Sequence, residues 1–339
     1  MIENQSEGEG FPVLILSFNR PEFTKRLINA LSFYKPSRVY FAVDGPRVGR
    51  VEDAAHVMET RELVNSIDWP AEIRTRFSEE NLGCKIGISS AIDWFFEYEE
   101  SGIILEDDCI PTTDFFPFVD KMLEKYKNDE RIMHISGSSF FPEKPDYIYN
   151  YYFSHLPSVW GWATWKTSWS KFRFQEKVES KSAAEDLIAS YFSSREISNW
   201  FKRYFYESLT PEATVWSTHW IYSIIENDGL AVNPIANLVR NIGFIPNSTH
   251  ASSESFQIFE GFEFGGLPDT PDPTEVAVNI GLDRLRFRVI KKSDPNLFIG
   301  RRIKIRILAW VYRFTPKSLK SVVKIFTTRN EALTRFLQK

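Results

Sequence analysis

The sequence is poor in cysteine, because Cys84 and Cys109 are the only two among its 339 residues. Two cysteines cannot build a disulfide framework or a cysteine-rich zinc site. The polar start of the chain, MIENQSEGEG, lacks the apolar core of a signal peptide. No uninterrupted apolar run approaches the ~18 to 20 residues that a membrane-spanning helix needs. These absences favour a cytoplasmic protein that is not integral to a membrane.

Charge is distributed unevenly along the chain. With 43% hydrophobic and 25% charged residues, the composition is that of a soluble globular protein, long enough for one large domain with an appendage. The segment from Arg284 to Lys339 carries 16 Lys or Arg and two acidic residues, a net charge of +14. The remaining residues carry 25 basic and 43 acidic residues, a net charge of −18. The chain therefore presents two surfaces of opposite sign.

Short apolar runs alternate with amphipathic stretches in the first half of the chain. The runs are bounded by turn formers, which is typical of strands, and the amphipathic stretches have helical periodicity. Repeated strand-then-helix units predict a Rossmann-like α/β fold with an open, mostly parallel sheet whose ligand crevice lies at the carboxyl ends of the strands. The expected strands are 11–18, 39–43, 73–77, 101–105 and 132–136, and the expected helices are 21–33, 86–98 and 115–126.

The second half of the sequence is less regular. An aromatic region at 140–169 has no assigned element, helical patterning covers 183–205 and resumes after Thr214, and a strand is expected at 238–244. An acidic stretch rich in glycine and proline follows, which we interpret as loop and linker. We expect a globular α/β domain over 1–253, a linker over 254–283 and a basic amphipathic helical tail over 284–339.

Three consecutive acids, Glu106, Asp107 and Asp108, follow the strand expected at 101–105. At least two of their carboxylates can face one space, where like charges repel unless a cation neutralises them. Oxygen ligands suit Mn²⁺ or Mg²⁺, which would in turn hold a diphosphate. The alternative is a solvated acidic turn. The metal is favoured because the triplet follows a buried strand, in series with other polar strand ends.

Polar residues also follow the first two strands. Arg20 precedes a helix, where backbone amides favour an anion and a guanidinium can contact phosphate in bidentate fashion. A surface ion pair is the alternative for this residue. The carboxylate of Asp44 can accept a hydrogen bond from a base edge or a ribose hydroxyl, unless the sequence Asp-Gly-Pro forms only a turn.

Five segments, in collinear order, resemble a known family. The region from Phe11 to His250 is similar to the GT-A glycosyltransferases related to N-acetylglucosaminyltransferase I and to bacterial relatives described as hemolysin-like glycosyltransferases. The resemblance implies a nucleotide sugar donor, a divalent metal and transfer with inversion at the anomeric carbon. The segments are SFNRPEFTKRLINAL, AVDG, NLGCKIGISSAIDWF, GIILEDDCIPTTDFFPF and SVWGWATWKTSW.

The resemblance also implies roles for the matched residues. Arg20 would approach the donor phosphates, and Asp44 would read the uracil. Glu106 would face the donor sugar, Asp107 the ribose or the sugar, and Asp108 the metal. The metal would neutralise charge on the departing nucleoside diphosphate. The loop that shapes the donor and acceptor pocket is matched by Trp160, Gly161 and Trp162.

Two positions depart from the family pattern. Ser89 stands where the family has a histidine near the base, and Ser217 stands where bacterial relatives carry an acid between two tryptophans. An inverting transferase needs a general base near the acceptor hydroxyl, and a serine cannot fill that role unaided. The candidates are His219, whose ordinary pKa suits proton transfer, and Glu212, about one or two turns upstream in a helix. A structural, hydrogen-bonded histidine is the alternative for His219.

His250 is a candidate to reach the diphosphate or the metal from the far side of the crevice, with an exposed loop histidine as the alternative. In the tail, segments 303–314 and 319–326 place apolar residues on one helical face and basic residues on another. This pattern is typical of interfacial helices drawn to anionic lipid, at ~1 kcal/mol per basic residue. Docking onto the acidic remainder of the chain is an alternative, and a nucleic acid is not expected as a partner.

The sequence therefore predicts a metal-dependent inverting glycosyltransferase at the inner face of the plasma membrane. It would move a sugar from a nucleotide diphosphate sugar, with uracil as the base, to a glycan or lipid-linked glycan. The alternative, motivated by Ser217, is a catalytically impaired sugar-nucleotide-binding or scaffold protein of a glycan assembly complex. A nucleotidyltransferase is a third reading, but the Gly-rich loop with Lys or Arg is missing after the first strand.

Overall fold

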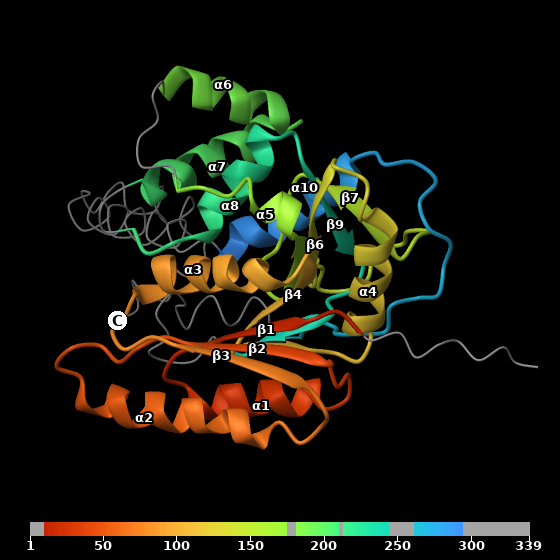
Figure 1. The fold of residues 1–339 in the computed structure, drawn as a ribbon. Coiled ribbons are helices and arrows are strands. Elements are labelled where there is room, and N and C mark those ends of the chain that lie inside the picture. The colour runs from red at the N-terminus through yellow and green to blue at the C-terminus, as the bar shows by residue number, and fades with distance from the viewer. Residues whose placement is uncertain (1–9, 175–180, 210–212, 244–260, 294–339) are drawn as a thin grey trace, which may run out of the picture.

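A sheet of eight strands, in the order β3-β2-β1-β4-β8-β6-β9-β7, forms the centre of the molecule (Figure 1). The computed structural model describes residues 10–174, 181–209, 213–243 and 261–293. All strands of this sheet point the same way except β8 and β7, which are antiparallel to their neighbours. The predicted open, mostly parallel α/β sheet is thus confirmed. The strands are β1 (Val13–Ser17), β2 (Arg38–Val43), β3 (Glu72–Phe77), β4 (Ser101–Glu106), β6 (Ile132–Ser136), β7 (Tyr151–Ser154), β8 (Trp162–Trp165) and β9 (Leu230–Pro234), and a second small sheet pairs β5 (Cys109–Pro111) with β10 (Val239–Asn241).

Helices cover both faces of the large sheet, with α1 and α2 on one face and α3 on the other (Figure 1). Successive side chains of a strand point to opposite faces, so Val13 and Ile15 pack into the core beneath α1, whereas Leu14 packs against α3 and a group of tryptophans. Three further helices, α6, α7 and α8, share their own apolar cluster. The helices are α1 (Pro21–Leu31), α2 (Val51–Glu62), the 3-10 helix η1 (Leu63–Ser66), α3 (Gly83–Tyr98), α4 (Phe115–Tyr126), α5 (Lys166–Trp169), α6 (Lys181–Tyr191), α7 (Arg195–Ser208), α8 (Ser217–Glu226) and α10 (Ile280–Ser293).

The aromatic region at 140–169, for which the sequence predicts no element, contains β7, β8 and α5. Every residue of both strands is buried, so neither shows the alternation that marks a half-exposed strand. Their partners are distant in sequence, because β8 pairs with β4 and β6, and β7 pairs with β9. Local periodicity carries no information about such pairings.

Helix α10 runs through the boundary that the sequence places between linker and tail at residue 283. Leu282 and Phe287 are buried, and the Asp283 carboxylate accepts hydrogen bonds from the Ser154 hydroxyl and, at 3.0 Å, from the His155 amide. The helix begins within the expected linker because its apolar positions dock on the sheet and on α7. The rest of the predicted tail, from residue 294, and the linker residues 254–260 lie outside the described residues. No helix of the described ranges is long and apolar enough to cross a membrane.

A chain that ends at residue 279 lacks α10 and exposes the surfaces that Leu282 and Phe287 cover. Burial of each large apolar side chain contributes about 1.5–3 kcal/mol, so we expect this chain to melt roughly 10 °C below a chain that ends at residue 293. Differential scanning calorimetry of the two chains measures the difference. Equal melting temperatures would show that α10 is an appendage rather than part of the folded body.

Candidate functional site

Three strands end side by side where the predicted site residues lie. β1 pairs in parallel with both β2 and β4, so that Ser17 is opposite Val43 and Leu16 is opposite Glu106. The residues that follow these strands therefore meet at one edge of the sheet. We call this group the carboxyl-edge site: Arg20, Asp44, Glu106, Asp107 and Asp108.

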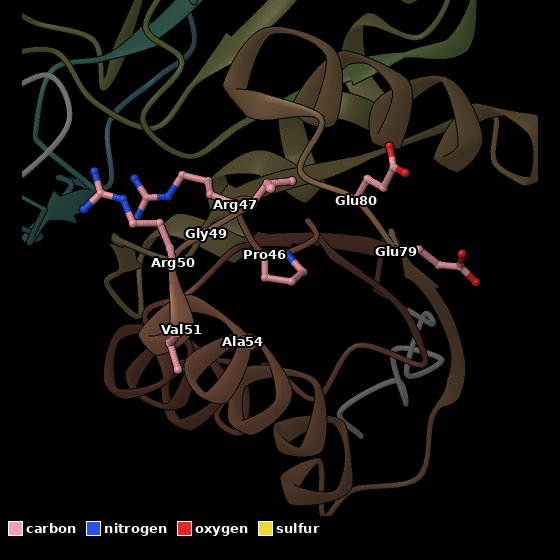
Figure 2. Close-up of a pocket in the computed structure, with 9 residues that line it drawn as sticks. Pro46, Arg47, Gly49, Arg50, Val51, Ala54, Glu79 and Glu80 are labelled. Carbon is pink, nitrogen blue, oxygen red and sulfur yellow. The ribbon is translucent and has the colours of Figure 1, made fainter.

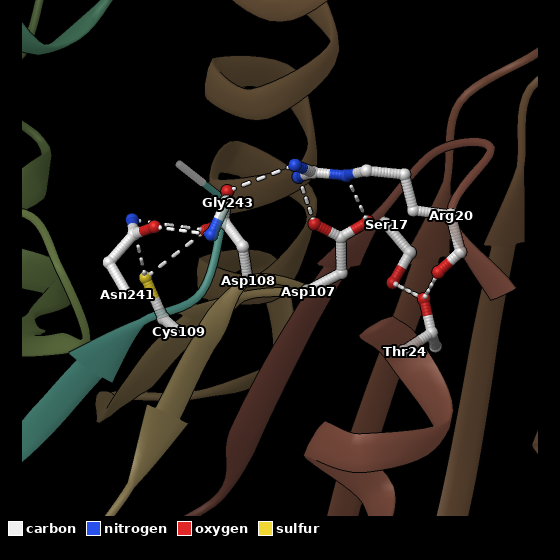
Figure 3. A network of polar contacts seen from close by, with 8 residues as sticks. All are labelled: Ser17, Arg20, Thr24, Asp107, Asp108, Cys109, Asn241 and Gly243. Carbon is white, nitrogen blue, oxygen red and sulfur yellow. Dashed lines mark hydrogen bonds and ion pairs between the residues drawn. The ribbon is translucent and has the colours of Figure 1, made fainter. Parts of the chain in front are cut away.

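The guanidinium of Arg20 links two of the three consecutive acids (Figure 3). Its Nη2 atom donates to Asp107 Oδ1, and its Nε atom donates to Asp107 Oδ2 at 3.2 Å. Its Nη1 atom donates to Asp108 Oδ2 at 3.1 Å. The Thr24 hydroxyl donates to the Arg20 carbonyl at 3.2 Å, which fixes the backbone at the start of α1. Arg20 thus forms an ion pair, and its partners are the acids of the predicted site.

The other side of Asp108 contacts a segment far along the chain. Asn241 Nδ2 donates to Asp108 Oδ1 at 3.4 Å, and a side chain on Gly243 would overlap the Asp108 carboxylate (Figure 3). Pairing of β5 with β10 brings these residues together. The sequence analysis does not identify Asn241 or Gly243. Their only mark in the sequence is that both are turn-forming residues within the strand expected at 238–244.

The acidic triplet is short of positive charge. Burial, and then the charge of Asp108, raise the pKa of Glu106 to about 8. Burial also raises the pKa of Asp107 to about 7, although Arg20 acts in the opposite direction. Burial lowers the pKa of Arg20, but the charges of Asp107 and Asp108 outweigh it, so the guanidinium stays protonated. The raised pKa values mean that the triplet holds protons near neutral pH, and a bound cation would displace them by supplying the missing positive charge.

No set of three or more His, Cys, Asp or Glu side chains within the described ranges is placed to hold a metal ion. Mg²⁺ needs only one or two carboxylates when a substrate supplies phosphate oxygens, and Mn²⁺ suits the same ligands. Asp108 fits this case, because its side chain is 15% exposed and its oxygens face Arg20 and Asn241 instead of apolar groups. His250, the other predicted ligand, lies outside the described residues.

The carboxylate of Asp44 binds the start of α3. Its Oδ1 atom accepts from the amides of Gly45 at 2.8 Å and Leu82 at 2.9 Å. Its Oδ2 atom accepts from the amide of Gly83 at 3.0 Å and from Asn81 Nδ2 at 3.1 Å. These bonds satisfy amides that a helix leaves free at its N-terminus. Asp44 is therefore a cap for α3, supplied from the end of β2, at the position where the resemblance expects a base-reading residue.

The aromatic loop before β8 is divided between the site and the core. Gly161 packs against Leu105, the residue before Glu106, so its neighbour Trp160 lies near the end of β4. Gly161 has a φ of 60°, and a side chain there would overlap β10, so the loop requires glycine. Trp162 is buried, and its ring stacks on His134 with the centroids 4.9 Å apart. Trp160 thus lies beside the carboxyl-edge site, whereas Trp162 supports it from within.

His219, the first candidate for the general base, is buried in α8 and its ring meets that of Phe174 edge to face at 5.4 Å. Burial, and then the charge of Lys85, lower its pKa to about 4, so the imidazole is neutral at physiological pH. Ser217 is half-buried at the start of α8. Ser89 is buried in α3 and donates to the Lys85 carbonyl at 2.9 Å. Glu212, the second candidate, lies outside the described residues.

The sequence analysis also misses Cys84, in the first turn of α3. Burial, and then the charge of Glu106, raise the pKa of its thiol to about 12, with Asp108 and Asp44 acting in the same direction. The thiol therefore lies close to the carboxyl-edge site and stays protonated. A cysteine in an amphipathic stretch gives no sign of such a position.

A pocket of about 360 Å³ lies along the loop that begins two residues after Asp44 (Figure 2). It lies between the loop after β2 and the segment before α3. Arg47 and Arg50 extend from one rim, and Glu79 and Glu80 lie on the other. The carboxylate of Asp53 holds Arg47 through bonds of 2.5 and 2.8 Å. The pocket therefore has a fixed guanidinium on one side and carboxylates on the other.

No protein-family model and no curated protein matches the chain. Among solved structures, HddC from Yersinia pseudotuberculosis is similar over 37% of this chain and 57% of its own, with 14% identity and a TM-score of 0.26. The 4-diphosphocytidyl-2C-methyl-D-erythritol synthase from Anaerococcus prevotii is similar over 68% of this chain and 92% of its own, with 9% identity and a TM-score of 0.34. The chain thus spans less than two thirds of HddC. Likenesses this distant carry no argument about activity.

Replacing Asp44 tests its role as a cap for α3. Asp44→Ala leaves the amides of Leu82 and Gly83 without their acceptor, so we expect a loss of about 1–2 kcal/mol in the free energy of unfolding. Asp44→Asn keeps one acceptor oxygen and is expected to lose less. Urea denaturation measures both, with Asp129→Ala, which breaks an exposed ion pair to Arg131, as the control. An Asp44→Ala variant as stable as the wild type would refute the capping role.

Proposed function

We propose that the carboxyl-edge site binds a nucleotide diphosphate sugar and that the protein is a metal-dependent inverting glycosyltransferase. The observation that carries this proposal is the guanidinium of Arg20 seated on Asp107 and Asp108 at the crevice of an open α/β sheet. A diphosphate needs cationic contacts, and these residues offer a guanidinium together with a carboxylate that can share a divalent ion with phosphate.

The geometry allows Arg20 to bind both acids in the free protein and to bind a phosphate of the donor in the complex. Its side chain is 35% exposed, and its Nη1 atom can turn from Asp108 to a phosphate oxygen while the other two donors stay on Asp107. A divalent ion at Asp108 would supply charge stabilisation for the departing diphosphate. Arg20 would hold the phosphates, and Glu106, beside Trp160, would face the sugar.

The pocket beside the site suits the nucleoside of such a donor. It opens off the loop that follows β2, and its first lining residue, Pro46, is two residues beyond Asp44. We assign the base, with uracil as the family resemblance implies, to the side of this pocket nearest Asp44. Asp44 already accepts four hydrogen bonds, about as many as a carboxylate can, so its contact with the base would require the Asn81 amide to leave Oδ2.

A second candidate function is supported by the burial of His219. The acceptor hydroxyl must meet its base, and the described conformation leaves His219 no exposed surface. A protein that binds the donor without transferring the sugar, as a scaffold of a glycan assembly complex, is consistent with this burial. Turnover separates the two functions, since both bind the donor and only the enzyme transfers the sugar.

The acceptor and the cellular location rest on the sequence alone. The basic, amphipathic pattern after residue 293 supports association with an anionic membrane surface. Such an enzyme would act at the inner face of the plasma membrane on a glycan or lipid-linked glycan.

Asp108→Asn tests the assignment of the metal. The amide keeps the shape of the side chain but removes its charge, so we expect UDP to lose Mn²⁺-dependent binding while the melting temperature stays close to that of the wild type. Isothermal titration calorimetry with UDP, with and without Mn²⁺, measures this. The matched control is Asp272→Asn, which removes a carboxylate that binds Lys121 and Lys125 instead. Undiminished Mn²⁺-dependent binding by Asp108→Asn would exclude this carboxylate as a ligand.

The candidates for the general base give a second test. If His219 takes the acceptor proton, His219→Gln is expected to lower sugar transfer by about 10²-fold or more with little change in donor affinity, and Glu212→Ala is expected to be mild. Because the pKa of His219 is lowered to about 4, the imidazole is neutral above about pH 5, and the wild-type rate should fall only below that pH. The opposite ranking would assign the role to Glu212. Sugar transfer that neither change lowers would mean that another residue is the base, whereas a wild type that binds the donor without transferring the sugar would favour the scaffold.

A further inference from the structure

Helix α10 carries an arginine into the interior of the protein. Arg286 has no exposed surface, its Nη1 atom donates to the Leu156 carbonyl, and its Nε and Nη2 atoms have no hydrogen-bond partner. Asp283, one turn earlier, is bound to Ser154 and His155. A buried charge with incomplete partners is destabilising, and a methionine would fill the same space without that penalty. The guanidinium therefore requires an explanation beyond packing.

The guanidinium lies against the ring of Phe140, with its central carbon 5.1 Å from the ring centroid. Phe140 has a φ of 59°, a backbone conformation that is unfavourable for a bulky residue and persists only when its surroundings enforce it. Asn237 Oδ1 accepts the Phe140 amide at 2.8 Å and so fixes the backbone. Arg286 contacts the ring by a cation–π interaction and so limits where the side chain can lie.

The ring of Phe140 in turn meets Trp160 edge to face, at 4.7 Å between centroids and 78° between planes. Trp160 precedes Gly161, which packs against Leu105 at the end of β4, one residue before Glu106. A chain of contacts therefore leads from α10, through Arg286 and Phe140, to an aromatic residue near the start of the acidic triplet. Each link is a packed ring or a charge on a ring, which transmits a displacement better than flexible polar contacts do.

We propose that Arg286 is a positioning residue for the carboxyl-edge site: through Phe140 it holds the indole of Trp160 beside Glu106. The role in ligand binding rests on the proposed function, whereas the placement of Trp160 does not. Arg286 lies beyond residue 283, in the part of the chain that the sequence assigns to a separate tail. The site would thus be completed by a helix that follows the segment 1–253, in which its other residues lie.

The first test needs no ligand. The protein is labelled with 5-fluorotryptophan, and the ¹⁹F resonances of Trp160 and Trp200 are assigned from Trp160→Phe and Trp200→Phe. Arg286→Met is expected to shift the resonance of Trp160, and Arg286→Lys, which keeps the positive charge, is expected to shift it less. The matched control is Phe287→Leu in the same helix, whose ring meets Trp200 at 5.6 Å, and which should shift Trp200 instead. An unmoved Trp160 in a folded Arg286→Met variant would overturn the proposal, and so would a resonance that Arg286→Lys moves as far as Arg286→Met does.

The second test measures binding of UDP with Mn²⁺ in a double-mutant cycle. Arg286→Met and Phe140→Leu are each expected to weaken binding by roughly 5- to 30-fold, and the double variant by no more than Phe140→Leu alone, because both changes release the same ring. Phe287→Leu should bind UDP as the wild type does. Additive losses would mean that Arg286 does not act through Phe140. If the wild type binds no UDP, the proposed function fails, and the ¹⁹F spectra still decide the placement of Trp160.

Discussion

The edge of the sheet depends on one contact, the guanidinium of Arg20 between the carboxylates of Asp107 and Asp108. Consecutive acids at the end of a buried strand repel each other, and burial raises the free energy of their charged forms further. Arg20 offsets part of this repulsion through three donors in a fixed planar arrangement. Because the loop after β1 must place that guanidinium over the end of β4, the parallel pairing of these two strands sets the position of Arg20 and of the acids that it binds.

The rest of the architecture holds this edge in place from several sides. Asp44 ties the end of β2 to the start of α3, and the pairing of β5 with β10 brings Asn241 and Gly243 against Asp108. The core below is rigid, with Trp162 stacked on His134 and His134 Nδ1 accepting from Trp220 Nε1 at 3.1 Å. The charged groups at the edge are therefore fixed by packing and hydrogen bonds from elements far apart in sequence, which is the condition for a preorganised binding site.

The sequence predicts most of the first half of the fold. It misses β5, and it misses α2 because the buried face of that helix carries Asp53 and Thr60 beside Val57. The helix expected at 115–126 and the strand expected at 132–136 have the same bounds as α4 and β6, because local amphipathicity and short apolar runs mark such elements directly. Strands β7 and β8 escape prediction because they are buried throughout and pair with distant partners. Helix α10 is not predicted as part of the folded body, because its apolar residues are interspersed with basic residues. The sequence alone assigns those basic residues to an independent tail.

Prediction of the site shows the same division. The positions of Arg20, Asp107 and Asp108 follow from polar residues at strand ends, but their mutual ion pair depends on a tertiary register. The cap formed by Asp44 depends on how α3 packs, and the burial of His219 depends on how α8 packs. The type of a single residue does not predict that packing. Asn241 and Gly243 become part of the site only when β10 meets β5. Sequence reasoning thus finds residues that a strand delivers to an edge and misses those that another element brings to them.

The central claim is that Arg20, Asp107 and Asp108 form a binding site for a nucleotide diphosphate. A crystal structure of the protein with UDP and Mn²⁺, with anomalous scattering to locate manganese, tests it most directly. We predict that the diphosphate lies between Arg20 and Asp108, that the Nη1 atom of Arg20 donates to a phosphate oxygen, and that the manganese peak lies on an Asp108 oxygen. A nucleotide bound elsewhere, with Arg20 still on Asp108 and no manganese at that carboxylate, would contradict the account.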